Sequence, residues 1–221
     1  MIEFKNVSKV YNNGTEALRN LSLSIAKGEF VFIVGSSGAG KSTFLKLIMR
    51  EEVPNSGEIV VNGRKLSTVR KRDVPYLRRT MGIVFQDFRL IDKMTVYDNV
   101  AFAMHIVGAS DREIRKRVPY VLGLVGLEKK MDNHPAELSG GELQRFCIAR
   151  ALAANPRYLL ADEITAMFDA VTQSQIWQAL LHEAKGRGLG MGIVSHSESL
   201  LKRICTRQID LKALQEKMAA V

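Results

Sequence analysis

The sequence FVFIVGSSGAGKST, residues 30–43, decides the fold. Its first five residues form an apolar run bounded by Gly28 and Gly35, which is typical of a buried parallel strand. The next eight residues, Gly35 to Ser42, match the pattern G-x-x-x-x-G-K-[ST], and the residues after them suit a buried helix. A strand, a glycine-rich loop and a helix in this order are the context that a phosphate-binding loop requires.

Each part of this loop has a chemical purpose. Glycines allow backbone N–H groups to turn toward phosphate oxygens, and the start of a helix adds a partial positive charge. Lys41 would meet the β- and γ-phosphates of a nucleotide, and the Ser42 hydroxyl would bind Mg²⁺. The alternative is a flexible glycine loop. We predict that the nucleotide contacts Gly35, Ser36, Ser37, Gly38, Ala39, Gly40, Lys41, Ser42 and Thr43.

The rest of the chain predicts an α/β fold, because strands that alternate with helices imply a parallel sheet. Asn62-Gly63 is a strong hairpin signal, so an antiparallel β part should flank the parallel core. Near the end of the chain, KALQEKMAAV reads as a short helix. The other apolar runs that suit strands are residues 81–85, 158–161 and 192–195.

The middle of the chain has a different pattern, with helices and no convincing strand. Its helical stretches lie around residues 96–107, 111–125 and 142–154. Trp177, Leu180 and Leu181 lie on one face of a later predicted helix, which Gly186 could end. We expect one domain, residues 1–221, with an α/β core of residues 1–86 and 156–221 and an inserted helical subdomain of residues 87–155.

Composition and charge limit the function classes. With 46% hydrophobic and 25% charged residues, the 221-residue chain should form one globular core. Cys147 and Cys205 lie far apart, which suggests neither a disulfide framework nor a zinc site and fits a reducing compartment. We find no signal peptide and no 18-residue apolar run, so we expect a cytosolic chain. The net charge of +9 favours anionic partners, although basic stretches are usually solvated faces.

Residues 158–163, YLLADE, read as an apolar strand that ends in two carboxylates. At strand spacing Asp162 and Glu163 point to opposite sides, so the two acids can have different functions. Asp162 would hold Mg²⁺, directly or through water, and Glu163 would polarise the water that attacks the γ-phosphate. The alternative is an ordinary strand end.

The sequence LSGGE, Leu138 to Glu142, precedes another helical run. Ser139 and Glu142 can form a capping box, which is a purely structural interpretation. A capping box does not explain Gly140 and Gly141, since each glycine costs up to about 1 kcal/mol relative to alanine in a helix. Paired glycines expose N–H groups at the positive end of a helix and so form a second anion site. Because the first loop already holds one nucleotide, we predict that this site faces a nucleotide held by another chain.

Together these motifs resemble those of the ATPase subunits of ABC transporters, over nearly the whole chain. The resemblance implies a P-loop NTPase (RecA-like) core, ATP and Mg²⁺ as cofactors, and hydrolysis of ATP to ADP and phosphate. It also implies a homodimer on ATP binding, with each ATP between one chain's phosphate loop and the other's LSGGE signature. The site residues that it adds are Tyr11 at the adenine, Gln86 in the Q-loop, Gln144 after the signature, Asp169 in the D-loop and His196 in the switch loop.

The added residues have both functional and plain interpretations. By the resemblance, Gln86 would sense Mg²⁺ and the attacking water, His196 would donate to the γ-phosphate, and Asp169 would align the facing subunit. Taken singly, Tyr11 could be a strand-packing residue, Gln86 a strand end and His196 a structural histidine. The expected catalytic set is Lys41, Gln86, Glu163 and His196, and the expected Mg²⁺ ligands are Ser42, Gln86 and Asp162.

The first two thirds of the chain are similar to the FtsE subfamily of bacterial cell-division ATPases, for example over PYLRRTMGIVFQDFRLIDKMTVYDNVAFA. This implies an FtsX-like integral-membrane partner, control of cell-wall hydrolases, and a peripheral position on the cytoplasmic side of the bacterial inner membrane. Residues 87–91 and Met94 would dock on that partner or pack the helical subdomain. The last third departs, because residues 162–177, DEITAMFDAVTQSQIW, are similar to peptide and nickel importer ATPases.

Three other functions stay open at this point. The chain could be the ATPase of a lipoprotein, peptide or small-solute transporter. A nucleic-acid machine is disfavoured, because about a hundred residues without sustained heptads separate Lys41 from Ser139, which leaves no room for long coiled coils. A nucleotide-gated adaptor without turnover is disfavoured because the expected catalytic residues are intact, namely Lys41, Asp162, Glu163 and His196.

Overall fold

The computed structural model describes residues 1–162, 164, 168–194 and 204–219. The chain folds into two compact units. The first consists of Met1–Arg78 and Gly190–Val221, and the second of Arg79–Leu189. The predicted boundaries of an inserted subdomain at residues 87 and 155 stay a prediction.

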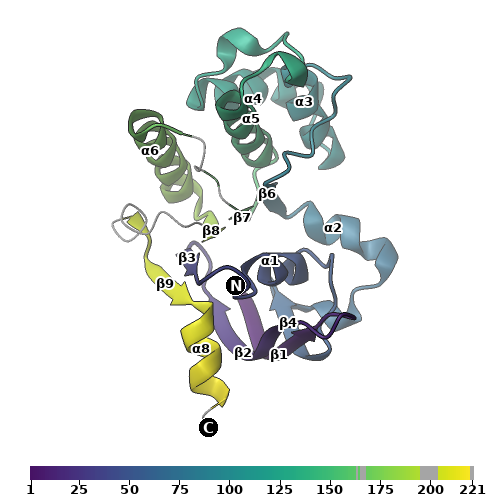
Figure 1. The fold of residues 1–221 in the computed structure, drawn as a ribbon. Helices are drawn as coiled ribbons and strands as arrows, with labels where there is room; N and C mark the ends of the chain where they lie inside the picture. The colour runs from purple at the N-terminus through teal and green to yellow at the C-terminus, as the bar shows by residue number, and fades with distance from the viewer. Residues whose placement is uncertain (163, 165–167, 195–203, 220–221) are drawn as a thin grey trace. The chain divides into compact units, whose positions relative to one another are not determined.

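The first unit contains a four-stranded antiparallel sheet in the order β2-β1-β4-β5 (Figure 1). Asn62 and Gly63, with φ of 52° and 77°, join β4 to β5 in the two-residue turn that the sequence predicts. The sheet has more strands than the strand pair that the sequence predicts. Register shifts along β1 break the simple alternation that marks a strand, so the sequence pattern does not indicate β1. Its strands are β1 (Ile2–Val10), β2 (Glu16–Ile25), β4 (Ser56–Val61) and β5 (Arg64–Lys65).

The same unit contains three parallel strands in the order β8-β3-β9. All five residues of β3 (Phe30–Val34) are buried, which explains its continuous apolar run. The helix α1 (Lys41–Ile48) follows β3 through the glycine-rich loop. The other elements are β8 (Gly190–Val194), β9 (Arg207–Asp210), α2 (Val74–Arg78), and the short 3₁₀ turns η1 (Leu66–Thr68) and η2 (Lys71–Asp73).

The predicted C-terminal helix is confirmed as α8 (Leu211–Ala219), which begins directly after β9 (Figure 1). Its Gln215 side chain accepts a hydrogen bond from the Arg19 backbone N–H at 2.7 Å. Arg19 lies on β2, an edge strand of the antiparallel sheet. The helix therefore satisfies a backbone donor that an edge strand would otherwise present to solvent.

In its described residues, the second unit contains a parallel strand pair and four α-helices. The helices α3, α4 and α5 pack against one another and match the three predicted helical stretches closely (Figure 1). The bounds are β6 (Met81–Val84), β7 (Tyr158–Asp162), α3 (Val96–Ile106), α4 (Asp111–Leu124), α5 (Gly140–Ala153), α6 (Ala170–Arg187), and the 3₁₀ turns η3 (Glu128–Lys130) and η4 (Pro135–Glu137).

The end of α6 differs from the prediction. Gly186 lies within the helix, and Gly188, with φ of 62°, is the residue that ends it. The Gly188 N–H donates to the Ala184 carbonyl, which closes the last turn. Two glycines stand close together in the sequence, and only the backbone shows which one adopts the left-handed conformation.

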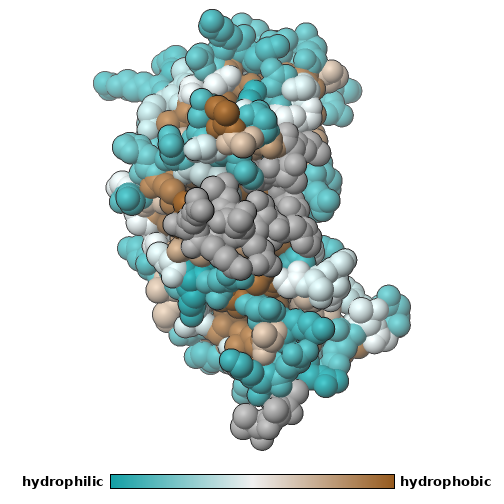
Figure 2. Space-filling view, turned by 60° about the vertical axis from the view of Figure 1, so that its left-hand side comes forward, coloured by the Kyte–Doolittle hydropathy of each residue, from teal (hydrophilic) through white to brown (hydrophobic). Residues whose placement is uncertain are grey.

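The face in Figure 2 is mostly hydrophilic, with small separate hydrophobic areas. Within the part of the chain that the structure describes, none of the helices combines the length and the apolar character needed to cross a bilayer.

Candidate nucleotide-binding site

The glycine-rich loop between β3 and α1 has the backbone geometry of a phosphate cradle. Gly40 precedes α1 with φ of 88°, and no side chain caps this end of the helix. A Cβ at Gly40 would lie only 2.2 Å from the Ala17 carbonyl oxygen and 2.7 Å from Leu18 Cδ2. Glycine is therefore required here by both conformation and space. The uncapped start of α1 also lacks acidic residues in its first turn, which suits an anion.

Lys41 lies inside this loop. Its ammonium donates to the carbonyl oxygens of Gly35 at 2.7 Å and of Ser36 at 3.0 Å, and the residue is only 8% exposed. These partners are neutral, so the charge of Lys41 can be compensated by a polyanion in the loop. This geometry fits the role in phosphate binding that the sequence predicts for Lys41.

Tyr11 lies beside the phosphate loop. Its hydroxyl is 3.1 Å from Thr43 Oγ1, and Thr43 belongs to the first turn of α1. The Lys9 ammonium lies 5.1 Å from the centre of the Tyr11 ring. Tyr11 directly follows β1 and is partly exposed, so it is not a buried strand-packing residue. Its contact with adenine stays a prediction.

A cavity of about 460 Å³ adjoins the phosphate loop within the first unit. One wall consists of residues 36–39, and another comes from Lys212, Gln215 and Glu216 of α8. Charged side chains of both signs line it, since Arg19 and Glu16 form an ion pair at 2.7 Å at its edge. The sequence does not predict this wall. The contact between Arg19 and Gln215 joins residues 196 positions apart, and nothing local in the sequence indicates it.

Gln86 and Asp162 lie at one edge of the second unit. The strands β6 and β7 are parallel, and Val84 pairs with Ala161, so both strands end at the same level. Asp162 is the last residue of β7, and Gln86 follows β6 by two positions. Two oxygen-bearing side chains at one carboxyl edge suit the predicted role in Mg²⁺ binding.

The predicted capping box at the start of α5 is present. The Ser139 hydroxyl accepts from the Glu142 N–H at 3.4 Å, and Glu142 Oε2 accepts from the Ser139 N–H at 2.9 Å. Hydrogen bonds from the backbone and the side chain of Ser139 hold the pKa of Glu142 below its ordinary value. Ser139 and Gly140 are nevertheless exposed, so the structural role leaves this tip accessible to a ligand.

The other predicted residues have these positions. Asp169 begins α6, and its carboxylate accepts from the Val171 and Thr172 N–H groups at 3.0 and 2.9 Å. Gln144 is buried in α5. Glu163 and His196 lie outside the described residues. The roles assigned to all four residues stay predictions.

Comparison with known proteins agrees with this geometry. Residues 18–166 match the family described as ABC transporter, and the chain belongs to that family as an ATPase subunit. It is 44% identical over 212 residues to the cell division ATP-binding protein FtsE of Bacillus subtilis (strain 168), which covers 96% of this chain and 92% of the relative. The resemblances to ABC ATPases and to FtsE are confirmed.

Two further relatives illustrate the range of the family. The methionine import ATP-binding protein MetN 1 of Listeria monocytogenes is 42% identical over 210 residues, covering 94% of this chain and 62% of that protein. Among solved structures, the dimeric bacterial ABC transporter cassette MJ0796 has a TM-score of 0.88 at 36% identity, covering 96% of this chain and 95% of that chain. A second structure of that cassette is a post-hydrolysis dimer bound to ADP and Pi. The predicted P-loop NTPase fold is confirmed.

Proposed function

We propose that this ATPase is the motor subunit of an FtsE-like membrane complex. The observation that carries the proposal is the phosphate loop. Gly40 starts α1 without a side-chain cap, and the Lys41 ammonium lies between two carbonyl oxygens of the loop. The similarity to FtsE over 96% of the chain supports a role in cell division.

Mg²⁺ should accompany the nucleotide. Ser42, Gln86 and Asp162 offer a hydroxyl, an amide carbonyl and a carboxylate, and oxygen donors are the ligands that Mg²⁺ prefers. Among the described residues there is no cluster of three or more His, Cys, Asp or Glu side chains. The ion would take further ligands from phosphate and water, and it would neutralise charge on the β- and γ-phosphates.

Two copies of the chain would hold two ATP molecules, each between the phosphate loop of one copy and the signature tip of the other. We define the signature tip as Ser139, Gly140 and Gly141. Ser139 and Gly140 are exposed and Gly141 is partly exposed, which supports this arrangement because only an accessible tip can reach a partner. Glu142 and Gln144 would support the tip, Tyr11 would stack on adenine, and Asp169 would align the facing copy. Glu163 would orient the attacking water, and His196 would donate to the γ-phosphate.

An FtsX-like integral-membrane protein would bind the second unit and hold the subunit at the cytoplasmic face of the bacterial inner membrane. Ile91, Phe102 and Ile106 are exposed apolar residues, as a docking surface requires. The segment with Ile91 is firmly fixed. The buried Asn99 amide accepts from the Ile91 N–H at 2.9 Å and donates to the carbonyls of Ile91 and Met94 at 3.0 and 3.2 Å.

A transporter ATPase is the second candidate, and the similarity to MetN 1 favours it. Purification in mild detergent distinguishes the two by the membrane protein that accompanies the chain. An FtsX-like protein would support the first proposal. A permease together with a solute-binding protein would support the second.

The substitution Glu163→Gln tests the motor function. We expect the variant to bind ATP, to hydrolyse it at least about a hundredfold more slowly because an oriented catalytic group is lost, and to accumulate as an ATP-bound dimer. Turnover and mass in solution are the measurements. Lys41→Ala is the matched comparison, since it should weaken binding itself. Unchanged turnover in the first variant would remove Glu163 from its role.

A further inference from the structure

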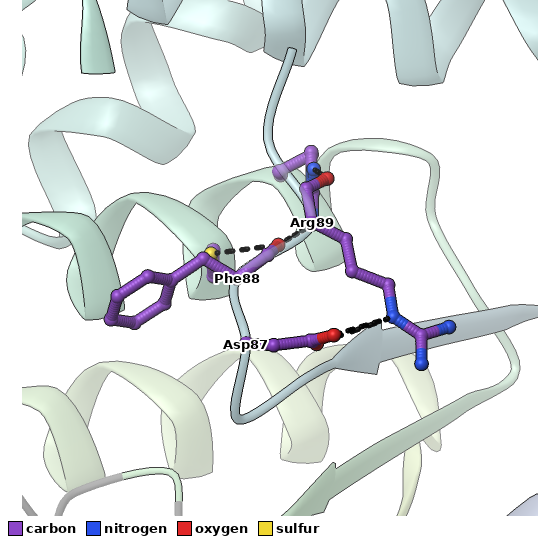
Figure 3. A network of polar contacts seen from close by, with 5 residues as sticks. Asp87, Phe88 and Arg89 are labelled. Carbon is purple, nitrogen blue, oxygen red and sulfur yellow. Dashed lines mark hydrogen bonds and ion pairs between the residues drawn. The ribbon is translucent and has the colours of Figure 1, made fainter. Parts of the chain in front are cut away.

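The three residues that follow Gln86 form a tight turn with an unusual backbone. Phe88 and Arg89 have φ of 57° and 49°, in a region that residues other than glycine rarely adopt. The Arg89 N–H donates to the Asp87 carbonyl at 2.6 Å, and Arg89 Nε lies 3.2 Å from the Asp87 carboxylate (Figure 3). Two successive left-handed residues of this kind persist only when contacts from outside hold them.

Those contacts come from α5. The Arg150 guanidinium donates through Nη2 to the Phe88 carbonyl at 2.7 Å and through Nη1 to the Arg89 carbonyl at 2.5 Å. One turn earlier, Cys147 Sγ lies 3.5 Å from the same Phe88 carbonyl oxygen. The planar fork of arginine can bind two adjacent carbonyl groups at once, which the single ammonium of lysine cannot do with the same geometry.

The charged guanidinium of Arg150 donates its hydrogen bonds to the backbone of the turn. In the described part of the chain, no carboxylate lies within ion-pair distance of it, and its hydrogen bonds go to backbone carbonyls. Burial lowers the pKa of the Arg150 guanidinium. The Arg89 guanidinium also lies 3.8 Å from the centre of the Phe85 ring. The turn therefore has a contact to the end of β6 as well as to α5.

The helix α5 connects this turn to the signature tip. It begins at the tip and continues through Arg150 as one helix. It also touches β6, the strand that leads to Gln86, because a Cβ at Gly82 would lie 2.4 Å from the Ala151 carbonyl oxygen. Strand and helix are therefore in backbone contact one residue away from Arg150.

We propose that Arg150 is a positioning residue that couples Gln86 to the signature tip. By fixing the turn Asp87–Arg89 onto α5, it makes the Gln86 segment and the helix that begins at Ser139 move as one body when nucleotide binds. Arg150 acts through Gln86 and does not itself contact the nucleotide. The inference rests on the proposed function, because it requires Gln86 and Ser139 to act on the same ATP cycle.

A purely structural role for Arg150 makes a different prediction. Loss of a structural contact lowers stability but leaves kcat per folded molecule unchanged. Loss of a coupling contact lowers kcat while the KM for ATP, which depends on the phosphate loop, stays the same. The distinction is therefore measurable in folded protein.

The test uses Arg150→Met, Arg150→Lys and, as a control, Arg115→Met, which removes an exposed arginine from α4. We expect Arg150→Met to lower kcat about tenfold to a hundredfold, since small misplacements of catalytic groups have costs of this size, with KM within about twofold. Arg150→Lys should recover only part of this loss, and it keeps the test possible if the methionine variant does not fold. The control should match the wild-type chain.

Hydrogen exchange gives the second measurement, on peptides that cover residues 85–91 and 139–145, with and without a non-hydrolysable ATP analogue and Mg²⁺. In the wild-type chain both peptides should respond to the nucleotide. In the Arg150 variants the first should respond and the second should not. Wild-type kcat in folded Arg150→Met or Arg150→Lys, or a response of both peptides in the variants, would overturn the proposal. If the wild-type chain bound no nucleotide at all, the proposed function itself would fail, and the coupling with it.

Discussion

The phosphate loop and the turn after Gln86 contain the same unusual backbone conformation, but they reach it by different means. In the loop the left-handed residues include Gly38 and Gly40, which have no Cβ to oppose this conformation. In the turn they are Phe88 and Arg89, and Arg150 holds their carbonyls. The loop is encoded by its own residues, whereas the turn depends on a residue about sixty positions away. One site is therefore set locally and the other by tertiary contact.

Among substitutions in these two regions, we expect Gly40→Ala to have the largest effect, a loss of affinity for ATP. The new Cβ would clash with the Ala17 carbonyl oxygen at 2.2 Å. Strain of about 3 kcal/mol corresponds to an affinity for ATP that is about a hundredfold lower. Equilibrium binding of a fluorescent ATP analogue measures it.

Gly38→Ala is the matched control. Its φ is also positive, at 80°, but nothing lies within 4 Å of the added Cβ. Only the conformational cost of about 1 kcal/mol remains, so the affinity should fall about fivefold. If both variants bound ATP equally well, close packing against Ala17 would not be what makes Gly40 necessary.

A smaller effect is expected for Gly82→Ala. This substitution tests the contact between β6 and α5, the helix that holds the turn after Gln86. Gly82 is needed for space rather than for conformation, since its Cβ would lie 2.4 Å from the Ala151 carbonyl oxygen. Overpacking here should lower the free energy of unfolding by about 1–3 kcal/mol. Urea denaturation measures it. Gly123→Ala in α4, where nothing lies within 4 Å, should instead leave stability unchanged or raise it by up to about 1 kcal/mol. A loss of the same size in both variants would contradict the close contact of α5 with β6.

The smallest effect on stability is expected at the capping box of Ser139 and Glu142, which is also encoded by neighbouring residues. Because hydrogen bonds from Ser139 lower the pKa of Glu142, the stabilisation from this carboxylate is present above the ordinary pKa of glutamate and is lost as pH falls through the lowered value. Glu142→Gln should flatten this dependence between neutral pH and about pH 3, since glutamine can still complete a capping box. Thermal unfolding at several pH values measures it. An equally steep acid-side loss in the variant would show that other carboxylates cause it.

The contrast between the two regions also explains what sequence analysis could find. The phosphate loop, the Asn62-Gly63 turn, the capping box at Ser139 and the helix after Asp210 each have their signal within a few residues, and the structure contains all of them. The α8 wall at Gln215 and the Arg150 contact join distant segments, so no local pattern indicates them. The end of α6 was misplaced by two residues for a related reason, since Gly186 and Gly188 differ only in the conformation that the fold imposes. Glu163 and His196 lie outside the described residues, so their roles stay predictions.

The central claim is that one ATP is held by the phosphate loop of one copy and the signature tip of another. The direct test mixes two variants with one new cysteine each, Ser37→Cys and Ser139→Cys, and adds a short thiol cross-linker. Both variants also carry Glu163→Gln and Cys205→Ser. Ser37 and Ser139 are exposed, and Cys147 is buried in every chain. We expect a covalent dimer of the two different chains that forms with ATP and Mg²⁺ and not without them. If ATP bound to the mixed chains and no such dimer formed, the shared grip on the nucleotide would be contradicted.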